Sequence, residues 1–132
     1  MGMKILLADD DIEDLELIED AIKKIKSTAV LDTVTNGRSV IEYLTRQPDQ
    51  SLPHLMILDY NMRELKGSEV LFILCNEKRY LNIPKIILST SNRPEHVQEC
   101  IKNGATQYFV KPNNIRDLET VVGKILAYAR PN

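Results

Sequence analysis

The sequence predicts an α/β fold, a single domain in which helices cover both faces of a five-stranded parallel sheet. Short, continuous apolar runs alternate with longer segments whose apolar residues recur every three or four positions. The first pattern is typical of strands buried on both faces, and the second of amphipathic helices. Strand–helix alternation favours a parallel sheet with crossover helices. The 132 residues are the size of one ordinary domain, without repeats or low-complexity linkers.

The N-terminal half alternates three expected strands with two expected helices. Residues 4–8 are a short apolar run that predicts a first, buried strand. Over residues 12–25, isoleucine and leucine recur at helical spacing, with acids in the first turns and lysines in the last, as the helix dipole favours. Residues 29–34 predict the second strand. After an Asn-Gly turn, residues 39–46 predict a helix that ends before a proline, and residues 55–58 predict a third, buried strand.

The C-terminal half continues the same alternation. Residues 67–78 predict a helix with valine and leucine on one face, and residues 85–88 predict a fourth buried strand. A proline in the first turn and a glycine after the end delimit a helix over residues 94–103. Residues 107–110 predict the fifth strand, and residues 115–128 predict a final amphipathic helix.

Composition and charge exclude several classes of protein. The 17 basic and 19 acidic residues give a net charge of −2, which argues against a nucleic-acid binder with a broad basic face. No apolar run approaches the roughly 18 residues of a membrane span, and the N-terminal run is too short for a signal peptide. We therefore expect a cytoplasmic protein without membrane insertion, in which Cys75 and Cys100 are reduced, packed thiols.

Polar and charged side chains follow four of the five expected strands. They are Asp9, Asp10 and Asp11 after the first strand, Asp59 after the third, Ser89, Thr90 and Ser91 after the fourth, and Lys111 after the fifth. Because ligands of parallel α/β sheets bind outside the carboxyl ends of the strands, we expect these side chains to face one crevice. Clustered carboxylates repel each other and favour Mg²⁺. Lysine and hydroxyl groups can hold a phosphoryl group that an aspartate accepts.

Each of these features alone has a simpler structural explanation. Aspartates before a helix are common N-caps, and a single acid such as Asp59 suits a loop. The acids between Glu13 and Asp20 are expected to form a solvated helix face. His54 and His96 have no second ligand at metal-binding spacing and are expected to be surface or structural residues. The joint placement of the strand-end groups is what indicates a phosphoryl site.

The motifs at these strand ends resemble those of the receiver domains of two-component response regulators. They are Ile5-Leu6-Leu7-Ala8-Asp9-Asp10, Leu55-Met56-Ile57-Leu58-Asp59-Tyr60-Asn61-Met62 with Gly67, Ile86-Ile87-Leu88-Ser89-Thr90, and Gly104-Ala105 with Tyr108-Phe109-Val110-Lys111-Pro112. The resemblance covers residues 3–130 and is closest to single-domain, chemotaxis-regulator-like receivers, including those paired with phytochrome-like kinases. It implies a flavodoxin-like (βα)5 fold, doubly wound with strand order 2-1-3-4-5. It also implies that residues 1–132 are one receiver domain with no output domain.

The resemblance implies a role for each strand-end residue. Asp59 matches the phosphoacceptor, and Lys111 matches the lysine that pairs with the active-site carboxylate and then with the phosphoryl oxygens. Ser89 matches the hydroxyl that moves to bond the phosphoryl group, and Tyr108 matches the aromatic residue that then turns inward. The resemblance also implies a binding site for Mg²⁺, in which Mn²⁺ can take the place of Mg²⁺. The ligands of this site are matched by Asp9, Asp10, Asp59 and the backbone carbonyl of Asn61.

Three features of this sequence differ from the family's usual pattern or lie at positions where the family varies. Arg63 stands where the family has a proline, which is expected to alter the mobility of that loop without loss of phosphorylation. Thr90 is bulkier than the usual small residue and is expected to narrow the access to Asp59. Asn61 and Ser91, with Thr90, flank the phosphoryl site where the family tunes hydrolysis.

These implications predict a phosphorylation-dependent signalling switch and not an enzyme. The phosphoryl group would come from a histidine kinase or a histidine phosphotransfer protein. The output would pass to another protein through the face of residues 94–103, 107–110 and 115–128, where a homodimer could also form. No direct contact with nucleic acid is expected.

Two alternatives stay open. One is a receiver fold that docks without phosphorylation. The other is a haloacid-dehalogenase-type phosphatase with Asp9 as nucleophile and Asp11 as general acid. The phosphatase is disfavoured because Glu13 stands where that family has threonine.

Overall fold

The five strands form one parallel sheet in the order β2-β1-β3-β4-β5 in a computed structural model of the chain, which describes residues 2–129. The strands are β1 (Lys4–Ala8), β2 (Val30–Val34), β3 (Leu55–Leu58), β4 (Lys85–Ser89) and β5 (Gln107–Val110). The helices are α1 (Ile12–Ile25), α2 (Gly37–Arg46), α3 (Gly67–Leu74), α4 (Pro94–Lys102) and α5 (Ile115–Leu126), with 3₁₀ turns at Asp49–Ser51 and Lys78–Tyr80. The predicted doubly wound fold and strand order are confirmed.

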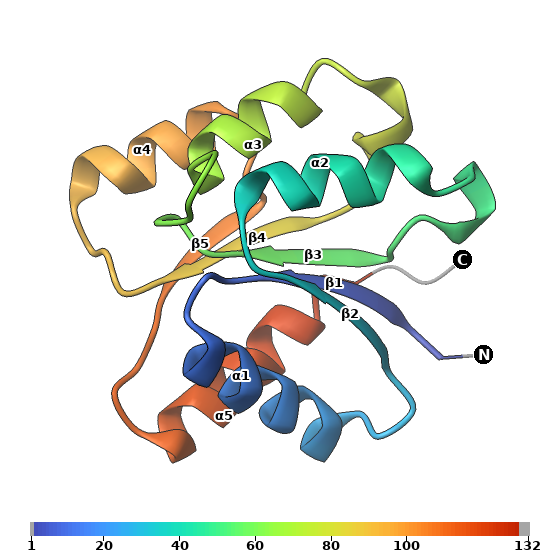
Figure 1. The fold of residues 1–132 in the computed structure, drawn as a ribbon. Helices are drawn as coiled ribbons and strands as arrows, with labels where there is room; N and C mark the ends of the chain where they lie inside the picture. The colour runs from blue at the N-terminus through green and yellow to red at the C-terminus, as the bar shows by residue number, and fades with distance from the viewer. Residues whose placement is uncertain (1, 130–132) are drawn as a thin grey trace.

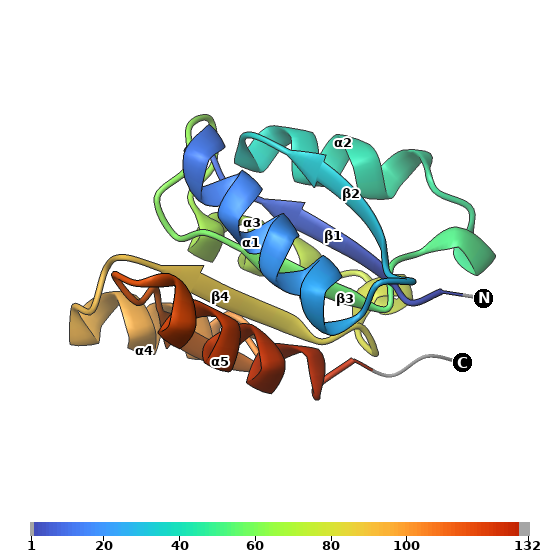
Figure 2. The ribbon, with the colours of Figure 1, turned by 90° about the horizontal axis from the view of Figure 1, so that it is seen from below.

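Helices cover both faces of the sheet. In Figure 1, α2, α3 and α4 lie above the sheet and α1 and α5 lie below it, and Figure 2 shows α1 and α5 side by side on that lower face. Successive side chains of a strand point to opposite faces, so each inner strand supplies two cores. In β1, Ile5 and Leu7 join the cluster under α1 and α5, whereas Leu6 and Ala8 join the cluster under α2, α3 and α4.

Four helix boundaries differ from the sequence prediction, and the smallest difference is that α4 ends at Lys102 instead of residue 103. α2 begins at Gly37 instead of residue 39, because the Asn36 side chain accepts the Ser39 N–H at 2.8 Å and so caps the helix. α3 ends at Leu74 instead of residue 78, and α5 ends at Leu126 instead of residue 128. The chain carries no glycine or proline immediately after either of these two ends. Without a glycine or proline there, the sequence carried no strong signal for where either helix ends.

The buried face of α1 is narrower than the predicted apolar stripe. Leu15, Ile18 and Ile22 are buried as expected, but Ile12 and Ile25 are 54% and 47% exposed. Both exposed residues lie at the ends of the helix, where few neighbouring elements cover a side chain. Apolar spacing alone therefore overestimated how far the core extends along α1.

The two cysteines are free and lie in different environments. Cys100 of α4 is buried, and burial raises the pKa of its thiol to about 12. Cys75 is exposed just beyond the end of α3, so the prediction of a packed thiol is wrong for this residue. Within residues 2–129, no helix has the length and apolar character needed to cross a membrane.

Candidate functional site

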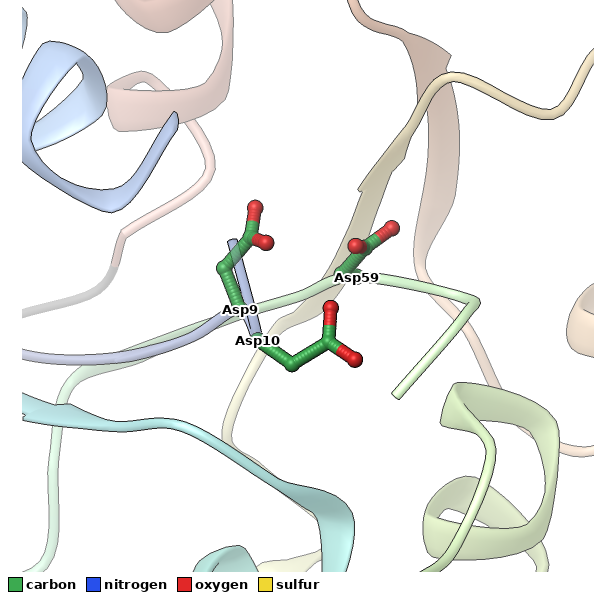
Figure 3. A group of neighbouring side chains, drawn as sticks. All are labelled: Asp9, Asp10 and Asp59. Atoms are coloured by element: carbon green, nitrogen blue, oxygen red, sulfur yellow. The ribbon is translucent and has the colours of Figure 1, made fainter. Parts of the chain in front are cut away.

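Three aspartates meet at the carboxyl ends of β1 and β3. Asp9 and Asp10 follow β1 and Asp59 follows β3, and each offers a carboxylate oxygen within 4.8 Å of the others (Figure 3). The strand order reverses at this point, because β2 lies on one side of β1 and β3 lies on the other. Ligand crevices of open α/β sheets form where the strand order reverses. The structure thus brings together the three aspartates singled out in the sequence.

The sheet fixes the backbone from which two of these side chains extend. The Asp9 N–H donates to the Val34 carbonyl of β2 at 3.2 Å, and the Asp59 N–H donates to the Ala8 carbonyl of β1 at 2.9 Å. Both aspartates therefore continue the hydrogen-bond ladder past the last strand residue. Their carboxylates extend from ordered backbone.

Gly67, at the start of α3, packs directly against the backbone of Asp59. The Gly67 N–H donates to the Tyr60 carbonyl at 2.8 Å, and a Cβ atom at Gly67 would lie 2.5 Å from the Asp59 carbonyl oxygen. Only a residue without a side chain permits this approach. Gly67 is therefore part of what places Asp59.

Lys111, after β5, contacts three carboxylates. Its Nζ lies 2.7 Å from Asp9 Oδ2, 2.8 Å from Asp14 Oδ2 and 3.5 Å from Asp59 Oδ2. The Lys111 N–H donates to the Ser89 carbonyl at 2.8 Å, which ties this residue to the end of β4. Because the lysine side chain is only 8% exposed, water screens these ion pairs weakly.

Burial and ion pairing shift the pKa values of Asp9 and Lys111 in opposite directions. Burial disfavours the charged form of Asp9 and raises its pKa to about 6, although hydrogen bonds from Lys111 and from the Asp11 N–H act to lower it. Burial also acts to lower the pKa of Lys111, but its bonds to Asp14 and Asp9 outweigh burial and leave the pKa above its usual value. Lys111 is thus a permanent positive charge beside Asp59.

Asp59 keeps one carboxylate oxygen without a partner. Its Oδ1 is buried and accepts no hydrogen bond from residues 2–129, whereas Oδ2 faces Lys111. Burying a polar atom without a hydrogen-bond partner costs free energy of folding unless a bound ligand supplies the partner. Carboxylate oxygens are also the ligands that Mg²⁺ and Mn²⁺ prefer. The three clustered aspartates therefore fit a divalent cation.

Hydroxyl groups border the crevice on the side of β4 and β5. Ser89 is fully buried, and its Oγ accepts the Ser91 N–H at 3.3 Å, whereas Thr90 is exposed. Tyr108 of β5 is half-buried, and its hydroxyl donates to the Ser91 carbonyl at 2.7 Å. Burial raises the pKa of Tyr108, so its hydroxyl stays a hydrogen-bond donor.

Asp14 is a residue of the site that was not predicted from the sequence. It was expected on a solvated face of the first helix, but Asp14 accepts a hydrogen bond from Lys111 at 2.8 Å. Asp11 is the N-cap of α1 and accepts the N–H groups of Glu13 and Asp14 at 3.0 and 3.2 Å. An acid three residues after an N-cap lies in the first helical turn, close to the strand ends. That spacing was the available signal.

The loop after β3 carries Asn61 and Arg63, both exposed. The Gly37 N–H donates to the Arg63 carbonyl at 3.1 Å, and Glu64 adopts a φ of 71° in the left-handed region. The backbone of this loop is therefore tied to the start of α2, although it lacks the proline that the resemblance led us to expect.

Comparison with known proteins places the chain among response regulators. The family model of the response regulator receiver domain matches residues 5–123. The two-component response regulator ARR17 of Arabidopsis thaliana is 33% identical over 125 residues, which cover 89% of this chain and 80% of ARR17. Some relatives are longer: the chain spans 56% of ARR8 from the same plant, with 28% identity over 86% of this chain.

Solved structures of response regulators share the fold. The crystal structure of the phosphorylated cyanobacterial phytochrome response regulator RcpA matches with a TM-score of 0.89 and 26% identity, covering 98% of this chain and 94% of that chain. The Mn²⁺-bound form of response regulator Rcp1 matches with a TM-score of 0.83 and 27% identity, covering 96% and 93%. The family match, the shared fold and the acidic cluster at the strand ends lead to one conclusion: this chain belongs to the response regulator receiver domains of two-component systems.

Proposed function

We propose that the chain is a phosphorylation-dependent switch in which Asp59 accepts a phosphoryl group from a histidine kinase or a histidine phosphotransfer protein. The observation that carries this proposal is the Asp59 carboxylate, which is buried with one oxygen unpartnered and with the Lys111 ammonium 3.5 Å from the other. The similarity to RcpA, whose structure was solved in a phosphorylated form, supports it.

The proposed transfer forms one bond and breaks one bond. A carboxylate oxygen of Asp59 bonds to phosphorus while the P–N bond of the donor's phosphohistidine breaks. The electron pair of that bond stays on the imidazole nitrogen, which then takes a proton from solvent. The product carries more negative charge than the carboxylate, and Lys111 balances part of it. The buried Ser89 hydroxyl is proposed to rotate and donate to a phosphoryl oxygen.

The proposed metal ligands are Asp9, Asp10, Asp59 and the backbone carbonyl of Asn61. Bound Mg²⁺, or Mn²⁺ in its place, would neutralise charge on the carboxylates and on the phosphoryl oxygens. The Mn²⁺-bound form of Rcp1 supports this choice of ion. Asn61, Thr90 and Ser91 border the crevice and are proposed to set how long the phosphoryl group survives.

Phosphorylation is proposed to alter the surface formed by α4, β5 and α5. The Tyr108 hydroxyl is bonded to the carbonyl of Ser91, two residues beyond Ser89, so a movement of Ser89 reaches Tyr108 through this loop. Such a switch has two conformations in equilibrium, and the charge of the phosphoryl group shifts the equilibrium toward one of them. Ile101 of α4 and Val110 of β5 are 45% and 44% exposed and offer apolar area to a partner protein or to a second copy of the chain.

The arrangement of Asp9 and Asp11 does not suit a haloacid-dehalogenase-type phosphatase. That chemistry needs Asp9 as a free nucleophile, but Asp9 Oδ2 accepts a bond from Lys111 at 2.7 Å and Asp9 Oδ1 accepts the Asp11 N–H at 2.9 Å. The Asp11 carboxylate, which would be the general acid, caps α1. Both aspartates therefore already have structural partners, and their contacts give no support to that mechanism.

Phosphoryl transfer from acetyl phosphate tests the proposal. With Mg²⁺ present, the intact protein is expected to gain the mass of one phosphoryl group. The gain should disappear when EDTA removes the metal, because the acidic cluster then repels the incoming phosphate. A folded protein that gains no mass with Mg²⁺ would contradict the proposal and favour a receiver fold that docks without phosphorylation.

Mg²⁺ is expected to stabilise the folded protein. The unfolded chain does not hold the three clustered carboxylates together, so the ion binds the native state preferentially. At about 100 times the dissociation constant the gain is about 2.7 kcal/mol. A melting-temperature titration measures it. Asp10→Asn should lose most of the rise, whereas Asp20→Asn, an exposed acid of α1 outside the cluster, should keep it. Equal rises in the two variants would contradict the assigned ligands.

A further inference from the structure

His96 of α4 contacts two loops of the candidate site. Its ring stacks on the ring of Tyr60, with centroids 4.1 Å apart and 14° between the planes. Its Nδ1 is hydrogen-bonded to Ser91 Oγ at 2.5 Å. Tyr60 directly follows Asp59, and Ser91 is two residues beyond Ser89. One side chain of α4 thus bridges the loop after β3 and the loop after β4.

Two further hydrogen bonds extend this contact. The Tyr60 hydroxyl donates to Glu99 Oε1 of α4 at 2.7 Å, and the Tyr108 hydroxyl donates to the Ser91 carbonyl at 2.7 Å. Tyr60 is 3% exposed, and burial together with the bond to Glu99 raises the pKa of Tyr60 to about 12. Its hydroxyl therefore remains a donor. The contacts Tyr60–His96–Ser91–Tyr108 form a continuous chain from the ends of β3 and β4 to Tyr108 of β5.

Apart from these contacts, few interactions fix the position of α4. Cys100 is its one fully buried residue, and Arg93 at its N-cap makes no capping hydrogen bond through its side chain. An element with little buried surface changes position at low cost. The stack on Tyr60 and the bonds through Ser91 and Glu99 are therefore prominent among the contacts that fix the helix against the site.

We propose that His96 is a positioning residue that makes α4 respond to the occupancy of Asp59, an inference that rests on the proposed phosphorylation of Asp59. When Ser89 turns toward a phosphoryl group, the loop that carries Ser91 moves, and the bond to His96 passes this movement to α4. The stack keeps α4 aligned with Tyr60, beside Asp59. Coupling between a binding site and a distant helix is carried by side chains that pack and hydrogen-bond in a continuous network and can adopt two arrangements.

Four variants separate the contacts of His96. His96→Phe keeps a ring for the stack on Tyr60 but loses the bond to Ser91, and Ser91→Ala removes the same bond from the other side. His96→Asn keeps a group that can bond Ser91 but loses the stack. Gln98→Ala is the matched control, because Gln98 is an exposed residue of the same helix.

The readout is the response of the backbone amides to beryllofluoride, a phosphoryl mimic, added with Mg²⁺ and followed by ¹⁵N NMR. The Ala8 amide, next to Asp9, reports occupancy of the site, and the Ile101 amide reports α4. In the wild type and Gln98→Ala, both amides are expected to shift. In His96→Phe and His96→Asn, Ala8 should shift fully while the shift of Ile101 falls about threefold. Because Ser91 borders the crevice, Ser91→Ala is read from the ratio of the Ile101 shift to the Ala8 shift, which should fall by the same factor. A purely structural role would lower the melting temperature without changing the ratio of the two shifts.

The double variant Ser91→Ala/His96→Phe completes the test. It should lose no more of the Ile101 shift than either single variant, because both substitutions remove the same hydrogen bond. Additive losses would overturn the inference, and so would an Ile101 shift of wild-type size in the His96 variants while Ala8 still shifts. The latter two results would leave the proposed phosphorylation standing. A wild-type protein whose Ala8 amide does not respond would overturn both proposals.

Discussion

Replacing Lys111 with methionine is expected to lower the free energy of unfolding by about 3 kcal/mol at neutral pH without Mg²⁺. The Lys111 ammonium pairs with Asp9 and Asp14 at 2.7 and 2.8 Å and lies 3.5 Å from Asp59. Methionine fills a similar volume without a charge. The cost therefore arises because buried carboxylates lose their counter-ion, and not because a cavity forms. Urea unfolding measures the difference as a shift of the midpoint at an unchanged slope.

Two comparisons test this explanation of the loss. Mg²⁺ should restore part of the lost stability, because a cation held by the aspartates replaces the missing positive charge. Lys24→Met is the control: Lys24 pairs with Glu119 at 3.1 Å but is 70% exposed, so its loss should change stability by less than about 1 kcal/mol. A Lys111→Met protein as stable as the wild type in the absence of Mg²⁺ would contradict this account of the site.

Replacing Gly67 with alanine is expected to damage both the fold and the placement of Asp59. The added Cβ would lie 2.5 Å from the Asp59 carbonyl oxygen and 3.1 Å from the Tyr60 Cα. Both are backbone atoms, so the chain itself must move, at a cost of about 1–3 kcal/mol. Because the displaced backbone carries the phosphoacceptor, phosphorylation by acetyl phosphate should slow by about 10- to 100-fold. Urea unfolding and the rate of mass gain measure the two effects.

Gly123→Ala is the matched control for this substitution. Gly123 lies in α5, and a Cβ atom there would meet nothing within 4 Å. Alanine in a helix avoids the conformational entropy that glycine loses on folding, so this variant should be more stable by about 0.5–1 kcal/mol. Its rate of phosphorylation should not change. If Gly67→Ala matched the wild type in stability and rate, Gly67 would have no part in placing Asp59.

Much of the fold could be predicted because its strongest signals are local. The apolar runs of β1 and β3 are buried on both faces, which a sequence expresses directly as a short run of consecutive apolar residues. The end of α3 at Leu74 could not be predicted, because the residues that follow it are compatible with a helix. The exposure of Ile12 and Ile25 also depends on which neighbours cover the ends of α1, and spacing does not contain that information.

The residues of the candidate site also divide into those that local sequence patterns predict and those that depend on tertiary packing. Asp9, Asp59 and Lys111 could be anticipated because parallel strands bring their carboxyl ends to one edge. Asp14 is one of eight acids between Asp9 and Asp20, and only the position of the first turn of α1 beside Lys111 singles it out as a partner of that lysine. The contacts of His96 join a helix to two separate loops, so a lone histidine in the sequence gave no sign of them.

Acceptance of the phosphoryl group by Asp59 is tested most directly by the mass of three proteins. Wild type, Asp59→Asn and Asp11→Ala are incubated with acetyl phosphate and Mg²⁺ under identical conditions, after circular dichroism has shown that each is folded. We predict one added phosphoryl group on the wild type and on Asp11→Ala, and none on Asp59→Asn. An adduct that persists in Asp59→Asn, or a wild type that never gains mass, would contradict the claim.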